Sequence, residues 1–345
     1  MCIMAILYRS AKNTPILVAA NREEYFERPT QHPRIQSGTP RVVCGIDRQA
    51  GGTWLGVNQY GLFCSVLNRR KSVVPAEPRS RGLLCRDLLN FRTAREAAEH
   101  AARELSSGRY AGANYVCLDA KFGAVVHGGD WVEIVELTPG LHIISSGDLD
   151  DGSDERHEML TRMLTLHKLD SAVAFLAVAS RAFARKPDSF GRPGLVTLGS
   201  DFGTVSSTLL SLPRRIQQAV MQYAPGPPSE VPYEDISALL RQVLSAERSR
   251  AKEKQAAAAA DGAKPETAGA AVAAASGISS APAPKPVAAK AAAAVAGSKH
   301  GGNKPSIAAR APAKPRPKKA PAAAKRAAAG DGRPGKAKSK GKAKK

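Results

Sequence analysis

The sequence predicts a layered α+β protein, followed by a long tail without regular structure. Two blocks of short apolar segments with strand-like length flank a block of helical segments, and further helical sequence closes the domain. This order predicts sheets that are covered by helices. It does not fit a regular alternation of strand and helix. Because the composition changes near residue 250, we expect a domain over 1–250 and a disordered tail over 251–345.

The first strand block starts at the beginning of the chain. Residues 3–8 and 16–20 are apolar and are joined by the polar turn RSAKNTP, which predicts two adjacent antiparallel strands. Three more short apolar runs follow, separated by the turn-forming residues Gly, Asn and Asp. These runs are at 41–47, 52–58 and 61–68.

Helical segments come next, and strands then return. Leucines at helical spacing predict a helix within 80–91, and Thr93 with Glu96 forms a capping-box pattern ahead of a helix that ends at Gly108. Further strands are expected at 114–120, 123–129, 131–137, 141–147, 194–199, 204–212 and 217–224. Further helices are expected at 154–167, 171–184 and 233–250.

The formal net charge of +21 belongs almost entirely to the tail. Of the 51 Lys and Arg residues, 21 lie in 251–345, together with only 4 of the 30 Asp and Glu residues. The domain over 1–250 therefore holds 30 basic and 26 acidic residues. Any conclusion about partners that rests on charge applies to the tail and not to the domain.

The composition argues against several classes of site. The five cysteines, at 2, 44, 64, 85 and 117, are odd in number and form no CxxC pair, which indicates neither a disulfide framework nor a zinc site. The histidines lack metal-ligand spacing, and we expect no cofactor. No apolar run reaches the roughly 18 residues of a membrane span. Since no basic stretch precedes the first apolar segment, we expect no signal peptide and a cytoplasmic, thiol-reducing location.

Cys2 is the residue whose position suggests chemistry most directly. If the initiator Met is removed, Cys2 carries a thiol and a free α-amine whose pKa near 8 suits a general base. The alternative is a small strand residue without a catalytic role. The polar run Asn21, Arg22, Glu23 and Glu24 follows the second strand, and pairing would bring it close to Cys2. There a carboxylate would hold the α-ammonium and an arginine would stabilise a thiolate or polarise a carbonyl, whereas the alternative is a solvated turn.

Several linked motifs resemble the NRDE family, also called the transport and Golgi organisation 2-like family. Its pattern is Met-Cys at the start, then Asn-Arg-Asp-Glu followed by an aromatic residue and Arg-Pro, then Gly-Gly-Thr-Trp-Leu-Gly. This chain reads MCIMAILY at 1–8, NREEYFERPT at 21–30 and GGTWLG at 51–56. The resemblance covers about 1–235 and leaves the tail outside.

The resemblance implies a four-layer αββα sandwich of the N-terminal-nucleophile hydrolase type, a class that cleaves non-peptide amide bonds. It implies that Cys2 is the nucleophile, that the run 21–24 holds it in position, and that the substrate is a small amide or acyl compound. Trp54, Asn68 and Ser146 are candidate substrate-binding residues, with core or loop packing as the alternative for Trp54 and a solvated loop for Asn68. Family members have been linked to secretion, Golgi organisation and haem handling, so the alternative function is a non-catalytic binding or trafficking protein.

Three positions depart from the family pattern. Glu23 replaces Asp and is one methylene longer, Ser146 stands where relatives tend to have Asn, and Val205 stands where many relatives have Arg. The lost amide donor and the lost cation argue against efficient hydrolysis. They leave the predicted fold unchanged.

The tail predicts a different kind of partner. It has no aromatic residue, so base stacking is not available and sequence-specific readout is not expected. Neutralisation of phosphates by Lys and Arg would instead give non-specific binding of DNA or RNA, most of it from the 15 basic residues in 304–345. The alternatives are a solubilising extension and binding to an anionic membrane surface, although no apolar anchor accompanies the charge. The candidate contacts are Lys314, Arg316, Lys318, Lys319, Lys325 and Arg326.

Overall fold

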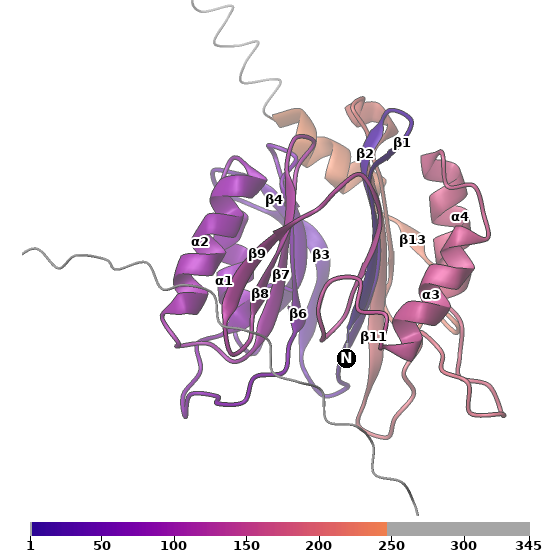
Figure 1. Ribbon diagram of the computed structural model, residues 1–345. Coiled ribbons are helices and arrows are strands. Elements are labelled where there is room, and N and C mark those ends of the chain that lie inside the picture. The colour runs from indigo at the N-terminus through magenta and orange to yellow at the C-terminus, as the bar shows by residue number, and fades with distance from the viewer. Residues whose placement is uncertain (1, 247–345) are drawn as a thin grey trace, which may run out of the picture. The chain divides into compact units, whose positions relative to one another are not determined.

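The computed structural model describes residues 2–246, which form four layers in the order helix, sheet, sheet, helix (Figure 1). Two antiparallel sheets pack face to face, and two helices cover the outer face of each. One sheet has six strands in the order β10-β1-β2-β11-β12-β13, and the other has seven in the order β3 to β9. The predicted αββα fold class is confirmed.

The six-stranded sheet combines strands from both ends of the domain. Its members are β1 (Ile3–Ala11), β2 (Thr14–Tyr25), β10 (Gly140–Ile144), β11 (Phe202–Leu212), β12 (Val220–Ala224) and β13 (Glu234–Asp235). The seven-stranded sheet is a meander of consecutive strands, interrupted once by two helices. Its members are β3 (Thr30–Gln36), β4 (Val42–Asp47), β5 (Leu55–Asn58), β6 (Phe63–Asn68), β7 (Ala113–Leu118), β8 (Gly123–Gly128) and β9 (Val132–Glu136).

The predicted pairing of the first two strands is confirmed. β1 runs antiparallel to β2, with Ile3 opposite Asn21 and Ala11 opposite Thr14. The second strand does not end near residue 20 as predicted, but continues to Tyr25, because β11 pairs along its other edge as far as that residue. The polar run 21–24 therefore belongs to a central strand and is not a turn.

Apolar side chains fill the three spaces between the layers. Inner-face residues of both sheets, such as Met4, Phe63 and Val116, form the core between the sheets. A second core lies between the seven-stranded sheet and helices α1 (Arg81–Leu88) and α2 (Ala94–Ser106). A third core lies between the six-stranded sheet and helices α3 (Glu155–Thr165) and α4 (Ala172–Phe183).

The helix starts follow from local sequence. The predicted capping box is confirmed, since the Thr93 hydroxyl accepts from the Glu96 N–H and the Glu96 carboxylate accepts from the Thr93 N–H. The last described helix begins at residue 237 and not at 233. The cause is tertiary, because residues 234 and 235 pair with β12 as strand β13.

Two local predictions differ from the structure. Residues 194–199 do not form a strand, and Leu198 makes an isolated bridge with Gly203. Strand β3 was not predicted, because its sequence TQHPRIQ is polar and contains a proline. It forms nevertheless because β3 lies at the edge of its sheet, where a proline without an N–H is tolerated.

Candidate active site

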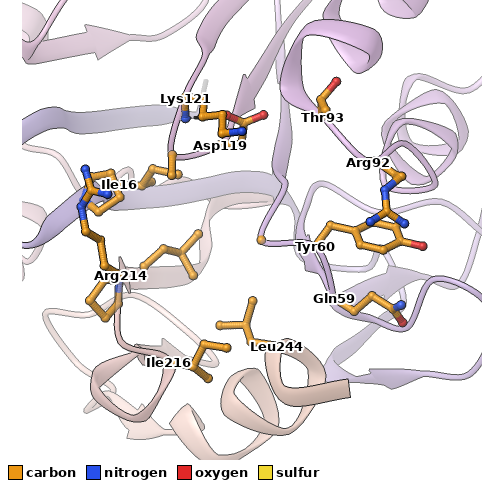
Figure 2. Close-up of a pocket in the computed structure, with 15 residues that line it drawn as sticks. Ile16, Gln59, Tyr60, Arg92, Thr93, Asp119, Lys121, Arg214, Ile216 and Leu244 are labelled. Atoms are coloured by element: carbon orange, nitrogen blue, oxygen red, sulfur yellow. Dashed lines mark hydrogen bonds between the residues drawn. The ribbon is translucent and has the colours of Figure 1, made fainter. Parts of the chain in front are cut away.

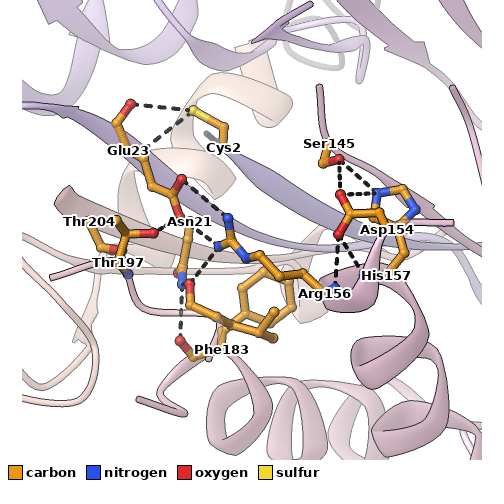
Figure 3. Close-up of polar contacts among 11 residues, drawn as sticks. Cys2, Asn21, Glu23, Ser145, Asp154, Arg156, His157, Phe183, Thr197 and Thr204 are labelled. Carbon is orange, nitrogen blue, oxygen red and sulfur yellow. Dashed lines mark hydrogen bonds and ion pairs between the residues drawn. The ribbon is translucent and has the colours of Figure 1, made fainter. Parts of the chain in front are cut away.

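Cys2 lies directly before β1, and strand pairing determines its neighbours. Since Ile3 is opposite Asn21, Cys2 lies beside Arg22 and Glu23. The Cys2 Sγ accepts a hydrogen bond from the Glu23 N–H, with Sγ and N 3.4 Å apart, and its S–H donates to the Glu23 carbonyl oxygen over 3.7 Å. The backbone of β2 thus holds the thiol (Figure 3).

The side chains of the run 21–24 point to two different faces of the sheet. Successive side chains of a strand alternate between its faces, and the apolar residues earlier in β2 divide in the same way between two cores. Asn21 and Glu23 face helices α3 and α4. Arg22 and Glu24 face the seven-stranded sheet, as Cys2 does.

Glu23 is fully buried on the helix side, where it pairs with Arg156 of α3. Its carboxylate accepts hydrogen bonds from Arg156 Nη2 at 2.6 Å, from Arg156 Nη1 at 3.4 Å and from Thr197 Oγ1 at 2.7 Å. The exposed fraction is 0% for the Glu23 side chain and 19% for the Arg156 side chain. This ion pair joins β2 to α3 and does not face the cavity beside Cys2 (Figure 3).

Asn21 also makes structural contacts on the helix side. Its Nδ2 donates to the carbonyl oxygens of Phe183 at 3.0 Å and of Leu195 at 2.9 Å. The first carbonyl ends α4, and the second belongs to the segment that follows it. Leu195 also accepts from Arg156 Nη2 at 3.0 Å, so Asn21 and Glu23 are part of one buried polar network.

Arg22 has a different environment on the inner face. Its guanidinium carbon lies 4.4 Å from the ring centroid of Trp54, and its Nη1 donates to Thr30 Oγ1 at 3.3 Å. The Glu24 carboxylate lies 3.7 Å from Arg22 Nη2 and 3.7 Å from Arg28 Nε. Burial lowers the pKa of the Arg22 guanidinium, which opposes the effect of Glu24. Arg22 is therefore a cation held against an aromatic face beside the thiol.

Gly45 of β4 and Gly52 of the GGTWLG segment make the position of Trp54 feasible. A Cβ on Gly45 would lie 2.2 Å from the Trp54 ring, so only glycine leaves room for the indole. A Cβ on Gly52 would lie 2.2 Å from the carbonyl carbon of Gly82 at the start of α1. The Thr53 N–H donates to the Gly82 carbonyl at 2.9 Å, which fixes the loop against that helix.

A cavity of about 470 Å³ opens beside Cys2, a volume that suits a small organic molecule. Cys2, Arg22 and Glu24 line it together with two of the three predicted substrate-binding residues, Trp54 and Asn68. Its further charged lining residues are Arg28, Asp47, Arg79 and Arg81. Glu23 also borders the cavity, although its carboxylate is bound to Arg156 on the other face of the sheet.

Ser146, the third predicted substrate-binding residue, is not among the residues that line this cavity. It lies two residues after Ile144, which pairs with Met4 of β1, so the same register would continue to Cys2. The adjacent Gly147 carbonyl is clamped by Arg69 Nη1 at 2.7 Å and by Asn114 Nδ2 at 2.9 Å. The backbone next to Ser146 is thus tied to the seven-stranded sheet.

Val205 lies at a β-bulge next to the site. Thr204 pairs with Glu23 and Ser206 pairs with Arg22, so Val205 is the extra residue between them. Its side chain is aliphatic, so position 205 supplies no cation to this edge of the site.

Burial raises the pKa of the Cys2 thiol. The Glu23 N–H and Arg22 act in the opposite direction, and the Glu23 carboxylate adds to the increase. The thiol is therefore protonated at neutral pH, and nucleophilic attack by this sulfur needs a base. Burial raises the pKa of Cys44 to about 11 and those of Cys64 and Cys85 well above the ordinary value. All five cysteines are free, and Cys2 is the most accessible of them.

The sequence analysis did not identify Arg156 and Thr197 as partners of the site. One signal for Arg156 was present, because it lies two residues after the N-cap Asp154, where the helix dipole disfavours a cation. A cation at that position indicates a specific acidic partner. No local pattern pointed to Thr197, which lies within the segment 194–199 that was expected to be a strand.

Two further searches concern only residues 2–246. In that range no group of three or more His, Cys, Asp or Glu side chains is arranged to hold a metal ion. None of the helices there has the length and apolar character needed to cross a membrane. The predicted nucleic-acid contacts, Lys314, Arg316, Lys318, Lys319, Lys325 and Arg326, lie outside the described residues, as does the predicted boundary at 250.

The αββα layers and the position of Cys2 agree with the family that the motifs suggested. Residues 1–184 match the family model described as Transport and Golgi organisation 2, and the chain belongs to this family. The Transport and Golgi organization 2 homologs of Mus musculus and Homo sapiens are each 26% identical over 144 residues, which cover 39% of this chain and 51% of theirs. The chain thus spans about half the length of these relatives. The Bos taurus homolog is 25% identical over 226 residues, 56% of this chain and 81% of that protein.

Solved structures with a similar arrangement include an acid amidase and an acylase. A Caenorhabditis elegans ortholog of N-acylethanolamine-hydrolyzing acid amidase is 16% identical, with a TM-score of 0.43 over 63% of this chain and 98% of that one. Penicillin V acylase from Agrobacterium tumefaciens is 14% identical, with a TM-score of 0.41 over 69% of this chain and 87% of that one.

Proposed function

We propose that this protein is a cysteine amidohydrolase that acts on a small amide or acyl compound, with Cys2 as the nucleophile. The observation that carries the proposal is the position of the Cys2 thiol. It lies on the wall of a cavity of about 470 Å³, against the backbone of β2 and next to the cation Arg22. Trp54 and Asn68, on the opposite sheet, supply an aromatic face and an amide to the same cavity.

The proposed reaction uses the α-amine of Cys2 after removal of Met1. Because the thiol is protonated at neutral pH, the α-amine takes its proton as the sulfur attacks the substrate carbonyl carbon. The tetrahedral intermediate collapses when the C–N bond breaks, and the same proton goes to the leaving amine. Water then cleaves the thioester, which releases the acid and restores the thiol.

The inner face of β2 supplies the electrostatics in this proposal. Arg22 lies where its guanidinium can attract the carbonyl oxygen of a substrate, and the Asn68 amide is a second donor on the facing wall. Asn21 and Glu23, in contrast, act only by holding strand β2 in place. This strand carries Arg22 and also the backbone groups that contact the Cys2 sulfur.

An activated ester tests the proposal without knowledge of the natural substrate. Incubation with p-nitrophenyl butyrate should release nitrophenol and add a butyryl mass to the peptide that begins with Cys2. Intact mass should show that Met1 is absent. Cys2→Ala should abolish the adduct, while Cys44→Ala, at a buried cysteine outside the cavity, should keep it. A variant with residues added before Cys2 has no α-amine on that residue and should lose turnover.

Two observations favour a second candidate, a non-catalytic binding protein on the same scaffold. The raised pKa of the Cys2 thiol and the aliphatic Val205 both reduce the reactivity of the site. In that case the mature protein should bind ligands in the cavity without forming an acyl adduct. Retention of Met1 in the intact mass, with no butyryl adduct on Cys2, would favour this candidate over the hydrolase.

We further propose that residues 304–345 bind DNA or RNA without sequence preference, and that the protein is cytoplasmic. The 15 basic residues of that segment support the binding of nucleic acid. The five free cysteines support the cytoplasmic location. The affinity for duplex DNA should fall linearly with salt on logarithmic axes. Deletion of 304–345 should remove most of the binding and leave the reactivity of Cys2 unchanged. Equal DNA affinity of the shortened and the full chain would contradict the proposal.

A further inference from the structure

A second cavity, of about 490 Å³, is lined by residues near the start of β2 and by Tyr60, Arg92 and Lys121 (Figure 2). Pro15 and Ile16, near the start of β2, line it, whereas Arg22 lines the cavity beside Cys2. Since six residues separate Ile16 from Arg22, strand geometry places the two cavities about 20 Å apart along β2. The chemistry proposed for Cys2 makes no use of this second cavity.

The floor of the second cavity is apolar. Ile16 and Leu212 come from neighbouring strands of the six-stranded sheet, and Leu244 comes from the helix that begins at residue 237. All three belong to the core between the sheets, and Ile216 packs against that core. In Figure 2, Leu244 and Ile216 lie between two polar walls. An apolar group in this cavity would therefore extend the core between the sheets.

The walls of the second cavity are cationic. Lys121 and Arg214 lie on one side, and Arg92 lies on the other side, over the ring of Tyr60 at 4.2 Å (Figure 2). Within residues 2–246, the Lys121 ammonium and the Arg214 guanidinium make no hydrogen bond or ion pair. Both side chains are exposed and free to turn toward a ligand.

The one carboxylate among the lining residues that the structure describes, that of Asp119, forms no ion pair with Lys121 or Arg214 and is bound to backbone groups. Asp119 accepts hydrogen bonds from three backbone N–H groups, those of Ala94 at 2.7 Å, Lys121 at 2.7 Å and Phe122 at 2.8 Å. These bonds hold the turn after β7 and the start of α2, and they occupy both carboxylate oxygens. The cavity therefore combines an apolar floor with two cations, Lys121 and Arg214, for which the structure of residues 2–246 shows no ion pair.

The geometry points to a binding site for an anionic amphiphile, a molecule with a carboxylate or phosphate head and an apolar chain. The chain would cover Ile216 and Leu244, and the head would pair with Lys121 and Arg214. An inorganic anion alone would leave the apolar floor in water, and a neutral lipid would leave the two cations without a partner. The basic tail has the same sign of charge as the walls, so it is not the occupant we expect.

Calorimetric titration of the full chain with decanoate tests this site. We expect saturable binding of decanoate, and weaker binding of decanol and of decyltrimethylammonium. Decyl phosphate in a parallel titration distinguishes the two head groups, and acetate and inorganic phosphate measure the head without a chain. Binding of decanoate or of decyl phosphate supports the site. Equal affinity for decanoate and decanol, or the absence of saturable binding by both anionic probes, overturns it.

Surface variants separate this cavity from the cationic tail, which also attracts anions. The double variant Lys121→Ala, Arg214→Ala should weaken binding of decanoate by about tenfold, because it removes both head-group cations and leaves the apolar floor intact. The matched variant Lys168→Ala, Arg215→Ala removes the same charge from exposed positions outside the cavity and should change the Kd by less than about twofold. Equal effects of the two double variants would assign the binding to general charge and contradict the proposal.

Discussion

The two faces of β2 at residues 21–24 use similar polar residues for different purposes. Toward the helices, Asn21 and Glu23 are completely enclosed, and each bonds to groups more than a hundred residues away in the chain. Toward the other sheet, Arg22 and Glu24 line a cavity and have longer contacts, of 3.3 to 3.7 Å. The comparison teaches that one short polar run can contain both structural residues and candidate active-site residues, one position apart.

The largest expected effect is a loss of stability when the ion pair between Glu23 and Arg156 is removed. Glu23→Ala leaves the Arg156 guanidinium without its carboxylate in a buried setting, which should lower the free energy of unfolding by about 3–5 kcal/mol. Glu24→Ala is the matched control, because its carboxylate is partly exposed and its ion pairs are 3.7 Å long, so it should cost less than about 1 kcal/mol. Urea unfolding measures both. Similar losses for the two variants would show that the two faces do not differ in this way.

A smaller loss of stability is expected at Asn21. Asn21→Ala removes two hydrogen bonds and leaves the carbonyl groups of Phe183 and Leu195 without this donor, which should cost about 2–3 kcal/mol. Asn68→Ala changes the same residue type at an exposed position on the cavity wall and should cost less than about 0.5 kcal/mol. Urea unfolding again reports both. A stable Asn21→Ala variant would mean that the link from β2 to α4 contributes little.

On the inner face we expect changes in reactivity with little change in stability. At neutral pH, iodoacetamide should label Cys2 before the four buried cysteines but more slowly than a cysteine in an unfolded peptide, because burial raises the pKa of the thiol. Arg22→Ala removes a nearby positive charge, which should slow the labelling a few-fold at neutral pH and move its pH profile to higher pH. Mass spectrometry of labelled peptides gives the rates. Faster labelling in Arg22→Ala would contradict this role of the cation.

The smallest expected effect is a pH dependence that belongs to the helix side. Burial lowers the pKa of His157 on α3, although Asp154, Asp151 and Asp150 oppose this change. The unfolded chain therefore binds a proton at higher pH than the folded chain, and this contribution to stability is lost as pH falls below the ordinary histidine pKa of about 6.5. His157→Asn should flatten the acid side of the stability profile, measured by urea unfolding at a series of pH values. An unchanged profile would exclude His157 as its source.

His142 provides a control of opposite sign. Burial alone would lower its pKa, but bonds to the Asp150 carboxylate and the Thr138 carbonyl raise it. Its contribution to stability is therefore present at low pH and is lost as pH rises above the ordinary value. His142→Gln should flatten the neutral side of the profile and leave the acid side unchanged. The opposite pattern would mean that the two histidines have been assigned the wrong way round.

The order of strands and helices was predictable because it depends on local information. Apolar periodicity, turn residues and the Thr93–Glu96 capping box are all readable within a few residues. The errors occurred where pairing with another strand overrides the local pattern. Strand β3 pairs with β4 despite its proline, residues 234–235 join β12 and do not start a helix, and β2 extends to Tyr25 because β11 supports it.

The sequence by itself determined which residues meet: Cys2 beside the run 21–24, through the pairing of two strands joined by a short turn. Only the tertiary structure decided what each residue of that run does. A strand sends alternate side chains to opposite faces, and the role of each face depends on what packs against it. Here α3 places Arg156 on one face, and the opposite sheet leaves a cavity with Trp54 on the other. Both partners are distant in the chain, so no local pattern could have separated Glu23 from Arg22.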